Sequence, residues 1–397
     1  MAVETKAIRH DKCSLLMAPI SAHVFIQQSG THMKSLLFDG VGTEPYLAEV
    51  AVADPRAGEV LVRMTTAGVC HSDLHVINGD WPFDHRVALG HEGAGIVEAL
   101  GEGISDLAVG DQVVLSWFAP CNTCASCIAG QSWLCQASGA ATNGLPDGST
   151  PLTAADGNEV RPYLGVGTFS DYAVVPRSAV VPIPAEVPAA VAALIGCSVT
   201  TGVGAVMNTA DVRAGQSAVV VGCGGVGQTI IMGLKLVGAS TIIAIDLSPD
   251  RLETATEFGA THTLRGDDPE LAEKIVAISN GGVDYAFDAI GLAATSARLP
   301  DYLKPGGAAV LVGMPARDVE VGFKTWHLVA TGKRILGCNY GSSRPQVDFP
   351  RIARLYLGGQ LPLDKLIGDT IPVADAARAI DDLRASTGRR MVVDHSL

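Results

Sequence analysis

The sequence predicts an α/β protein of two domains, in which an irregular, mostly-β domain is joined to a Rossmann-type domain with a doubly wound parallel sheet. From Lys34 to about Val199, short alternating runs are separated by glycine and proline, as in short strands joined by turns. From about Thr200, apolar runs of strand length alternate with helical stretches, which is typical of a parallel sheet covered by helices. A length of 397 residues fits about two domains.

Residues 1–33 precede the first strand-like run, which begins at Lys34. They show neither a helical period nor the apolar block of a signal peptide, so we leave them unassigned, as an N-terminal extension or tag. The mostly-β domain is expected over residues 34–199, with strands in runs such as Gly58–Met64 and Ala94–Ala99. The chain is expected to return to this domain over residues 341–397, because about sixty residues are too few for a third core.

The Rossmann-type domain is expected over residues 200–340. It opens with a strand at Ala218–Val221, a glycine turn, a helix to Val237 and a strand at Thr241–Asp246, which together form a βαβ unit. Ser248 and Pro249 then supply a capping side chain and a first-turn proline for the next helix. Further strands are expected near residues 261–264, 283–288, 308–312 and 334–338.

The glycine turn, Gly222-Cys-Gly224-Gly225-Val226-Gly227, is a candidate dinucleotide-binding motif. Alone the pattern is weak, since glycines also make tight strand–helix connections, but here it follows a strand, opens a helix and precedes Asp246 by about twenty residues. The helix N-terminus would bind a pyrophosphate, and Gly224 would let the backbone approach it closely. Asp246 would accept hydrogen bonds from the ribose and repel a 2′-phosphate, which predicts NAD rather than NADP.

Four cysteines, Cys121, Cys124, Cys127 and Cys135, follow the spacing C-x₂-C-x₂-C-x₇-C. Four thiolates at this spacing suit a closed tetrahedral zinc site of the structural type. The alternative is a disulfide cluster, but a long chain without a secretory signal has little need of disulfides. The sequence therefore predicts a structural zinc at this loop.

Cys70, His91 and Cys197 are scattered along the chain and would meet only on folding. Two thiolates and one imidazole leave zinc a fourth coordination position for substrate. This combination of ligands is known from the catalytic zinc of alcohol dehydrogenase. Alone, Cys70 or Cys197 would more often be a small buried apolar residue. The set predicts a second zinc, of the catalytic type.

The formal net charge of -13 and a pI near 5.2 give no basic surface for nucleic acid or for an anionic membrane. The apolar stretch around Val187–Met207 is interrupted by proline, glycine and threonine, so no membrane span is expected. The composition predicts a soluble, cytoplasmic enzyme that acts on a small molecule.

Together these motifs resemble the zinc-dependent alcohol dehydrogenases of the medium-chain dehydrogenase/reductase superfamily. Cys70–His75, Gly90–Glu92 and Gly196-Cys197 resemble the segments that carry the three catalytic ligands, in the family's order. The resemblance covers nearly all of the chain from Lys34 and implies a GroES-like catalytic domain with two zinc ions per subunit. It also implies NAD-linked oxidation of a primary alcohol to the aldehyde, and the reverse reduction, by hydride transfer from an alkoxide held at the zinc.

The resemblance further implies roles for residues around the metal. Ser72 would take the proton from the alcohol and pass it through the nicotinamide ribose to His75 and solvent. Without this context, Ser72 would be read as a turn hydroxyl and His75 as a surface histidine. Asp73 and Glu92 would lie behind the zinc ligands, with a carboxylate fixing the histidine tautomer and offsetting the metal charge, although direct ligation by Glu92 stays open.

Other residues would contact the dinucleotide or the substrate. His71 would face the pyrophosphate, Thr201 the nicotinamide and Arg251 the adenosine ribose. The pyrophosphate-binding arginine falls on Arg390, with Arg389 as the alternative. The family's pocket positions fall on two tryptophans, Trp81 and Trp117, whose broad apolar faces favour aromatic, allylic or medium-chain alcohols.

One departure from the family concerns the relatives that oxidise S-hydroxymethylglutathione. They carry an arginine shortly after the fourth structural cysteine, whereas Cys135-Gln-Ala-Ser-Gly139 has none, so this substrate is not expected.

We expect a homodimer or homotetramer, with the strand at 308–312 or at 334–338 as the dimer edge. Two alternatives stay open: a permanently bound nicotinamide serving an alcohol/aldehyde dismutase or dye-linked oxidoreductase, and a non-catalytic structural protein.

Overall fold

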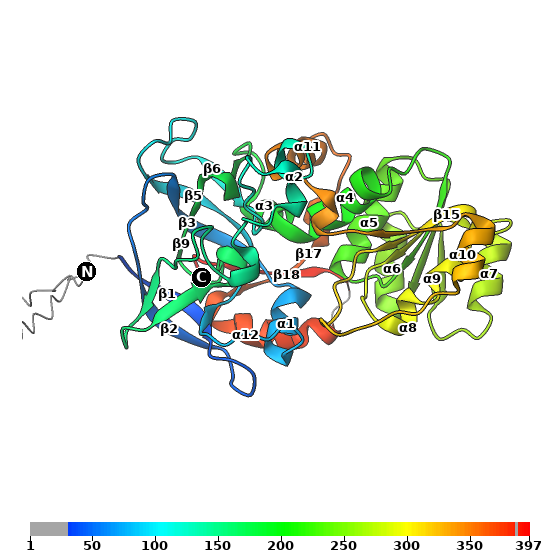
Figure 1. Cartoon of the computed structure of the whole chain (residues 1–397), viewed down its shortest axis with the longest axis horizontal. Coiled ribbons are helices and arrows are strands. Elements are labelled where there is room, and N and C mark those ends of the chain that lie inside the picture. Colours follow the sequence, from blue (N-terminus) through cyan, green and yellow to red (C-terminus); the bar gives the residue numbers. More distant parts are fainter. Residues whose placement is uncertain (1–30, 386–387) are drawn as a thin grey trace, which may run out of the picture.

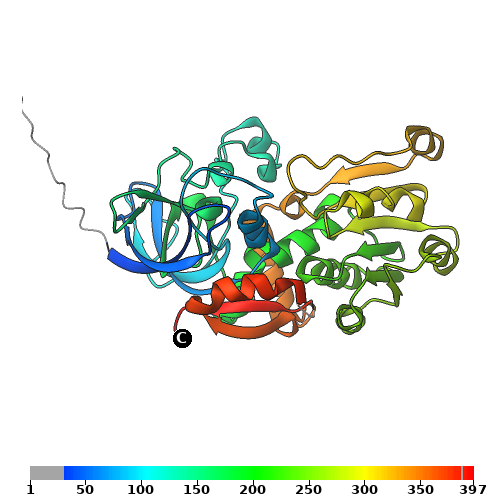
Figure 2. The same cartoon turned by 90° about the horizontal axis from the view of Figure 1, so that it is seen from below.

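The structure is a computed structural model and describes residues 31–385 and 388–397. Figure 1 shows the mostly-β domain beside the Rossmann-type domain, with the C-terminal strand β18 (Arg390–Asp394) returning to the mostly-β domain. Seen from below, the C-terminal segment lies along the junction of the two domains (Figure 2). This arrangement leaves a cleft where the two domains face each other.

The mostly-β domain contains a closed barrel of β1 (Thr31–Phe38), β2 (Tyr46–Val52), β7 (Leu152–Ala154), β8 (Glu159–Pro162) and β4 (Val87–Ala88). Strand β1 begins at Thr31, because Thr31 already pairs with Val52 and Met33 is buried. Three residues that the sequence analysis set apart with the N-terminal extension therefore lie in the barrel. The rest of that extension, residues 1–30, lies outside the described residues.

A second sheet in this domain carries Glu92 at the start of one of its strands. Strand β3 (Glu59–Gly68) pairs antiparallel with β5 (Glu92–Leu100) on one side and with β18 on the other. The sheet is completed by β6 (Gln112–Leu115), β9 (Tyr172–Pro176), β10 (Val180–Pro182) and β17 (Ile367–Pro372). Since β17 and β18 come from the end of the chain, residues beyond 341 return to this domain, as expected from their short length.

The Rossmann-type sheet is parallel throughout, in the order β13 (His262–Arg265), β12 (Thr241–Asp246), β11 (Ser217–Val221), β14 (Val283–Asp288), β15 (Leu303–Leu311) and β16 (Arg334–Gly337). Each of the six predicted strands is present. Strand β15 lies inside the sheet and β16 at its edge. The order reverses beside β11, where ligands bind in sheets of this type.

Helices cover the sheets and link the domains. Helix α1 (His71–Asn78) and α2 (Ala125–Ile128) belong to the mostly-β domain, and α5 (Gly225–Leu236), α6 (Pro249–Phe258) and α7 (Leu271–Ile278) to the Rossmann-type domain. Further helices are α8 (Ala293–Ser296), α9 (Leu299–Tyr302), α10 (Thr325–Thr331), α11 (Pro345–Leu357) and α12 (Ala376–Asp381).

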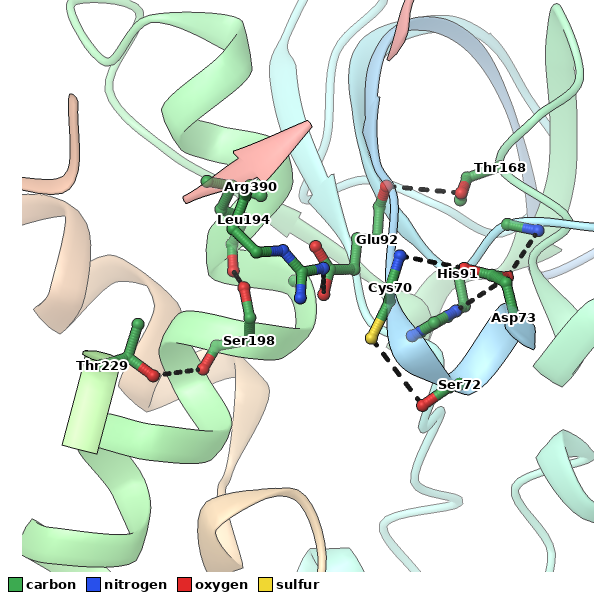
Figure 3. A network of polar contacts seen from close by, with 12 residues as sticks. Cys70, Ser72, Asp73, His91, Glu92, Thr168, Leu194, Ser198, Thr229 and Arg390 are labelled. Carbon is green, nitrogen blue, oxygen red and sulfur yellow. Dashed lines mark hydrogen bonds and ion pairs between the residues drawn. The ribbon is translucent and has the colours of Figure 1, made fainter. Parts of the chain in front are cut away.

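A continuous helical segment, Ala189–Thr209, runs across the expected domain boundary at residue 200. It consists of α3 (Ala189–Leu194), α4 (Thr200–Gly204) and two wider π turns, one of which, Ile195–Val199, carries Cys197. By length and composition it is apolar enough to cross a membrane, but 83% of its apolar window is buried inside the fold, so it is a core helix. The Thr229 hydroxyl of α5 donates to the carbonyl of Ser198, joining the two domains at this helix (Figure 3).

Candidate active site and metal centres

A cleft of about 1620 Å³ lies between the two domains. Residues from both domains line it, including most of the predicted site residues: Cys70, His71, Ser72, His75, Trp81, His91, Trp117, Cys135, Cys197, Thr201, Gly222, Gly224, Gly225, Val226, Asp246, Arg251, Arg389 and Arg390. The predicted residues Asp73, Glu92 and Gly227 lie behind this wall. Folding thus brings segments from three distant parts of the chain to one cavity.

The candidate catalytic metal centre consists of Cys70, His91, Glu92 and Cys197. One ligand atom from each lies within 4.8 Å of all the others, and all four residues are buried. The His91 Nε2 atom has no hydrogen-bond partner among the described residues. A buried nitrogen without a partner is costly unless a metal or ligand satisfies it. Two thiols and this imidazole nitrogen therefore fit a zinc ion of the open type.

Asp73 holds the residues of this centre in place through hydrogen bonds. Its Oδ2 accepts the backbone N–H of Cys70 at 3.2 Å, while Oδ1 accepts the backbone N–H of Gly90 at 3.2 Å and lies 3.3 Å from His91 Nδ1 (Figure 3). These bonds hold Cys70 at the start of α1 and leave His91 Nε2 facing the thiols. Asp73 is fully buried, so the bonds also offset the cost of burying its charge.

Glu92 and Arg390 form a buried ion pair at 2.7 Å (Figure 3). Burial raises the pKa of the Glu92 carboxyl, and the positive charge of Arg390 opposes that rise. The Arg390 side chain also reaches the glycine turn, since a Cβ atom at Gly225 would lie 2.5 Å from Arg390 Cδ. Arg389 instead pairs with Glu257 at 2.7 Å. Of the two arginines, Arg390 therefore lies between the metal centre and the glycine turn.

The second metal centre consists of Cys121, Cys124, Cys127 and Cys135, whose sulfur atoms lie within 4.8 Å of one another. The Thr123 hydroxyl and the backbone N–H of Cys124 donate to the Cys121 sulfur and lower its pKa, which favours the thiolate. The four sulfurs fit the structural zinc predicted from their spacing. Ser132, within the same loop, donates to the Ser343 carbonyl at 3.1 Å, so the loop docks on the segment after β16.

The glycine turn has one position open to a ligand, and its other three glycines are closed by packing: a Cβ atom at Gly222 would lie 2.4 Å from Ile290 Cγ1, and Gly225 is covered by Arg390. A Cβ atom at Gly227 would lie 1.8 Å from the Gly222 carbonyl oxygen, whereas one at Gly224 would meet nothing within 4 Å. Gly222 has φ 91°, which favours glycine. Asp246 ends β12, is nearly buried, and accepts the N–H groups of Cys223 at 2.7 Å and Ser248 at 2.9 Å. Arg251 Nη1 lies 3.9 Å from Asp246.

The predicted relay residues lie on one wall of the cleft. Ser72 Oγ is 3.8 Å from Cys70 Sγ, beside the metal centre. His75 Nδ1 is 2.6 Å from Asp80 Oδ2, and its ring stacks on Trp81 with centroids 4.7 Å apart. His71 is close to His75, with ring centroids 5.9 Å apart, and burial lowers the pKa of His71.

Sequence reasoning missed two tyrosines beside the metal centre. Tyr163 donates to the Ser72 carbonyl at 3.0 Å and sets its ring edge-on to His91. Tyr340 donates to the carbonyl of Gly196, next to Cys197, and its ring centroid lies 4.4 Å from that of Trp117. Both tyrosines are distant in sequence from their partners, and no motif marks them.

Comparison with known proteins agrees with this geometry. Residues 56–185 match the alcohol dehydrogenase GroES-like domain, and residues 225–357 match the zinc-binding dehydrogenase domain. The S-(hydroxymethyl)glutathione dehydrogenase of Paracoccus denitrificans is 35% identical over 357 residues, which span 87% of this chain and 95% of that protein. The chain belongs to the zinc-dependent alcohol dehydrogenase family. The predicted family and its two-domain fold are thereby confirmed.

Solved alcohol dehydrogenases share the whole architecture. Benzyl alcohol dehydrogenase from Acinetobacter calcoaceticus has a TM-score of 0.87 at 30% identity, covering 92% of this chain and 99% of that one. An alcohol dehydrogenase zinc-binding domain protein from Burkholderia ambifaria has a TM-score of 0.87 at 33% identity, with the same coverage. The prediction of an enzyme that uses zinc and a nicotinamide dinucleotide is confirmed at the level of the family.

Proposed function

We propose that this alcohol dehydrogenase oxidises a primary alcohol with a bulky apolar group, aromatic, allylic or medium-chain, to the aldehyde with NAD, and catalyses the reverse reduction. The observation that carries the proposal is the set of large apolar side chains that line the same cleft as the metal centre: Trp81, Phe83, Trp117, Phe118 and Leu164. Broad apolar faces of this kind bind benzylic or longer substrates better than small polar ones.

The neighbouring wall argues against a glutathione adduct as substrate. Gln136, Ser138, Ala140 and Asn143 line the cleft after the fourth structural cysteine, and residues 136–143 contain no lysine or arginine. An acidic substrate would find no positive charge there. Relatives named S-(hydroxymethyl)glutathione dehydrogenase share the fold, while the benzyl alcohol dehydrogenase shows that the fold also serves an aromatic alcohol.

The chain's own residues account for the handling of the proton and the cofactor. Cys70, His91 and Cys197 would hold zinc, which polarises the alcohol oxygen while the nicotinamide accepts hydride. Ser72, beside the metal ligands, takes the hydroxyl proton, and His75, on the same wall and partly exposed, passes it to solvent. Tyr163 fixes the backbone of Ser72 through its hydrogen bond to the Ser72 carbonyl.

The preference for NAD follows from Asp246. Two backbone N–H groups hold its carboxylate at the carboxyl end of β12, where the adenosine ribose of a dinucleotide is bound in this type of sheet. A 2′-phosphate would meet this negative charge. The wild-type enzyme should have a lower KM for NAD than for NADP, and Asp246→Ala is expected to reduce this difference. An unchanged difference would contradict the role of Asp246 in selecting NAD.

We also propose that the enzyme is a cytoplasmic homodimer or homotetramer. Of the two strands considered from sequence, β16 has the free edge, and Trp326 of the neighbouring helix α10 is 80% exposed. Pairing of two β16 edges would satisfy their backbone groups and cover this helix. Light scattering of the purified protein tests the oligomer.

The substrate assignment is tested by Trp117→Ala. The wild-type enzyme should have a higher kcat/KM for benzyl alcohol than for ethanol, and the variant should lose about tenfold or more of the benzyl alcohol value, since an aromatic contact and its buried area are removed. The ethanol value should fall less. Equal losses for the two alcohols would contradict an aromatic-binding role for Trp117.

A further inference from the structure

Trp81 makes a hydrogen bond across the cleft. Its indole Nε1 donates to the carbonyl oxygen of Pro315 at 2.9 Å. Trp81 follows α1 in the mostly-β domain, whereas Pro315 lies just beyond β15 in the Rossmann-type domain. Within the described part of the chain, no other hydrogen bond joins residues 313–319 to the mostly-β domain.

Residues 313–319 form a wall of the cofactor half of the cleft. Gly313 and Pro315 line it together with Gly224 and Ile290 of the same domain. The start of this wall is fixed to its own domain, because a Cβ atom at Gly313 would lie 2.4 Å from the Gly291 nitrogen. Met314 is 50% exposed, so the wall beyond Gly313 has little packing of its own. Trp81 therefore supplies its attachment to the opposite side of the cleft.

The same indole ring contacts the relay histidine. Trp81 stacks on His75 with the ring planes 23° apart, and the other side of His75 is held by the 2.6 Å contact between Nδ1 and Asp80 Oδ2. One side chain thus contacts both the cofactor wall and the wall that carries the relay.

We propose that Trp81 is a positioning residue that latches the cofactor wall to the mostly-β domain over the bound dinucleotide. For the dinucleotide to leave, residues 313–316 must move away from the opposite wall, which breaks the bond from Nε1 to the Pro315 carbonyl. The latch therefore slows cofactor release. The link to His75 rests on the proposed function, whereas the latch rests only on the dinucleotide lying in this cleft.

The test compares two tryptophan-to-phenylalanine variants of the zinc-loaded enzyme. Trp81→Phe removes the N–H donor but keeps a ring beside His75, and NADH dissociation, followed by stopped-flow fluorescence, should be about two- to tenfold faster, the scale of one neutral hydrogen bond. Trp133→Phe is the matched control, because Trp133 lies in the four-cysteine loop and does not line the cleft. Its NADH dissociation should match that of wild type.

Unchanged NADH dissociation in Trp81→Phe, or equal acceleration in Trp133→Phe, would overturn the latch. If Trp81→Phe does not fold, a benzothienylalanine at position 81 keeps the shape of the indole without its N–H, and the same acceleration is expected. NADH is bound without any alcohol in this experiment. The NADH dissociation rate can therefore be interpreted even if the substrate assignment is wrong. Conversely, an unchanged dissociation rate would not contradict the proposed reaction.

Discussion

At the scale of single residues, the geometry of the metal centre depends on side chains that are not themselves candidate ligands. Asp73 holds Cys70, Gly90 and His91 at once, and Tyr163 fixes the backbone of Ser72. Such bonds keep the reacting groups in place before substrate arrives, which is where much of the advantage of an enclosed site originates.

Ser72 provides the sharpest prediction at this scale. Ser72→Ala removes the hydroxyl proposed to take the proton and should lower kcat by about a hundredfold or more, the usual range for a lost proton-transfer group. Ser72→Thr keeps a hydroxyl on the same helix turn and is the matched variant. We expect it to retain most of the activity in initial-rate assays at saturating alcohol. A fall of similar size in both variants would contradict the relay.

Some residue-level features were predictable and others were not. The zinc ligands and the glycine turn have fixed local spacings or family segments around them, so the sequence predicts them directly. The Glu92–Arg390 pair and the Trp81–Pro315 bond join positions 298 and 234 residues apart. Only the folded chain brings these partners together, and neither partner carries a local signal of the contact.

At the scale of elements, different glycines of the turn serve packing and ligand binding. Gly227 is needed by the fold, since its position abuts the Gly222 carbonyl, whereas Gly224 faces open space and has φ -72°, which any residue adopts. The central strands of this domain, such as β11 and β12, were predictable because each is a short apolar run. The edge strands β13 and β16 are more polar and more exposed, and only their place in the alternation of strands and helices indicated them. The helix across residue 200 was not predictable, because glycines and threonines interrupt its pattern.

The two glycines should therefore respond differently to substitution. Gly224→Ala should fold with a melting temperature close to that of wild type but bind NADH at least about tenfold more weakly, because its methyl group occupies the approach of the pyrophosphate. Gly227→Ala should lose about 2 kcal/mol or more of stability, since helix and strand must separate. Thermal unfolding and NADH titration of both variants measure this. Normal NADH binding by Gly224→Ala would contradict the assigned cofactor site.

Mutations in the two metal centres should have different effects on the enzyme. Cys70→Ala should abolish turnover and lower the zinc content by about half, while the four-cysteine loop keeps its metal. Cys124→Ala should instead lower the melting temperature by about 5 °C or more, because zinc binding stabilises the folded loop that docks beside Ser343. Zinc analysis, calorimetry and initial rates distinguish the outcomes. Retained turnover in Cys70→Ala would contradict the catalytic centre.

At the scale of the whole molecule, function depends on two domains that meet at one cleft. The mostly-β domain supplies the metal ligands and the apolar wall, and the Rossmann-type domain supplies the glycine turn and Asp246. The core helix over residues 189–209 runs between these parts, and the Arg390 side chain of the mostly-β domain reaches Gly225 in the glycine turn of the other domain. The sequence predicts both domains and the return of the C-terminus, but the depth and lining of the cleft arise only from their packing.

The most direct test of this account is the ratio of kcat/KM for benzyl alcohol to that for S-(hydroxymethyl)glutathione, measured with NAD and the zinc-loaded enzyme. The large apolar side chains that line the cleft and the uncharged segment 136–143 predict a ratio above about ten, since one well-placed aromatic contact alone is worth about that factor. A ratio below one would contradict the proposed substrate class and place this enzyme with its glutathione-dependent relatives.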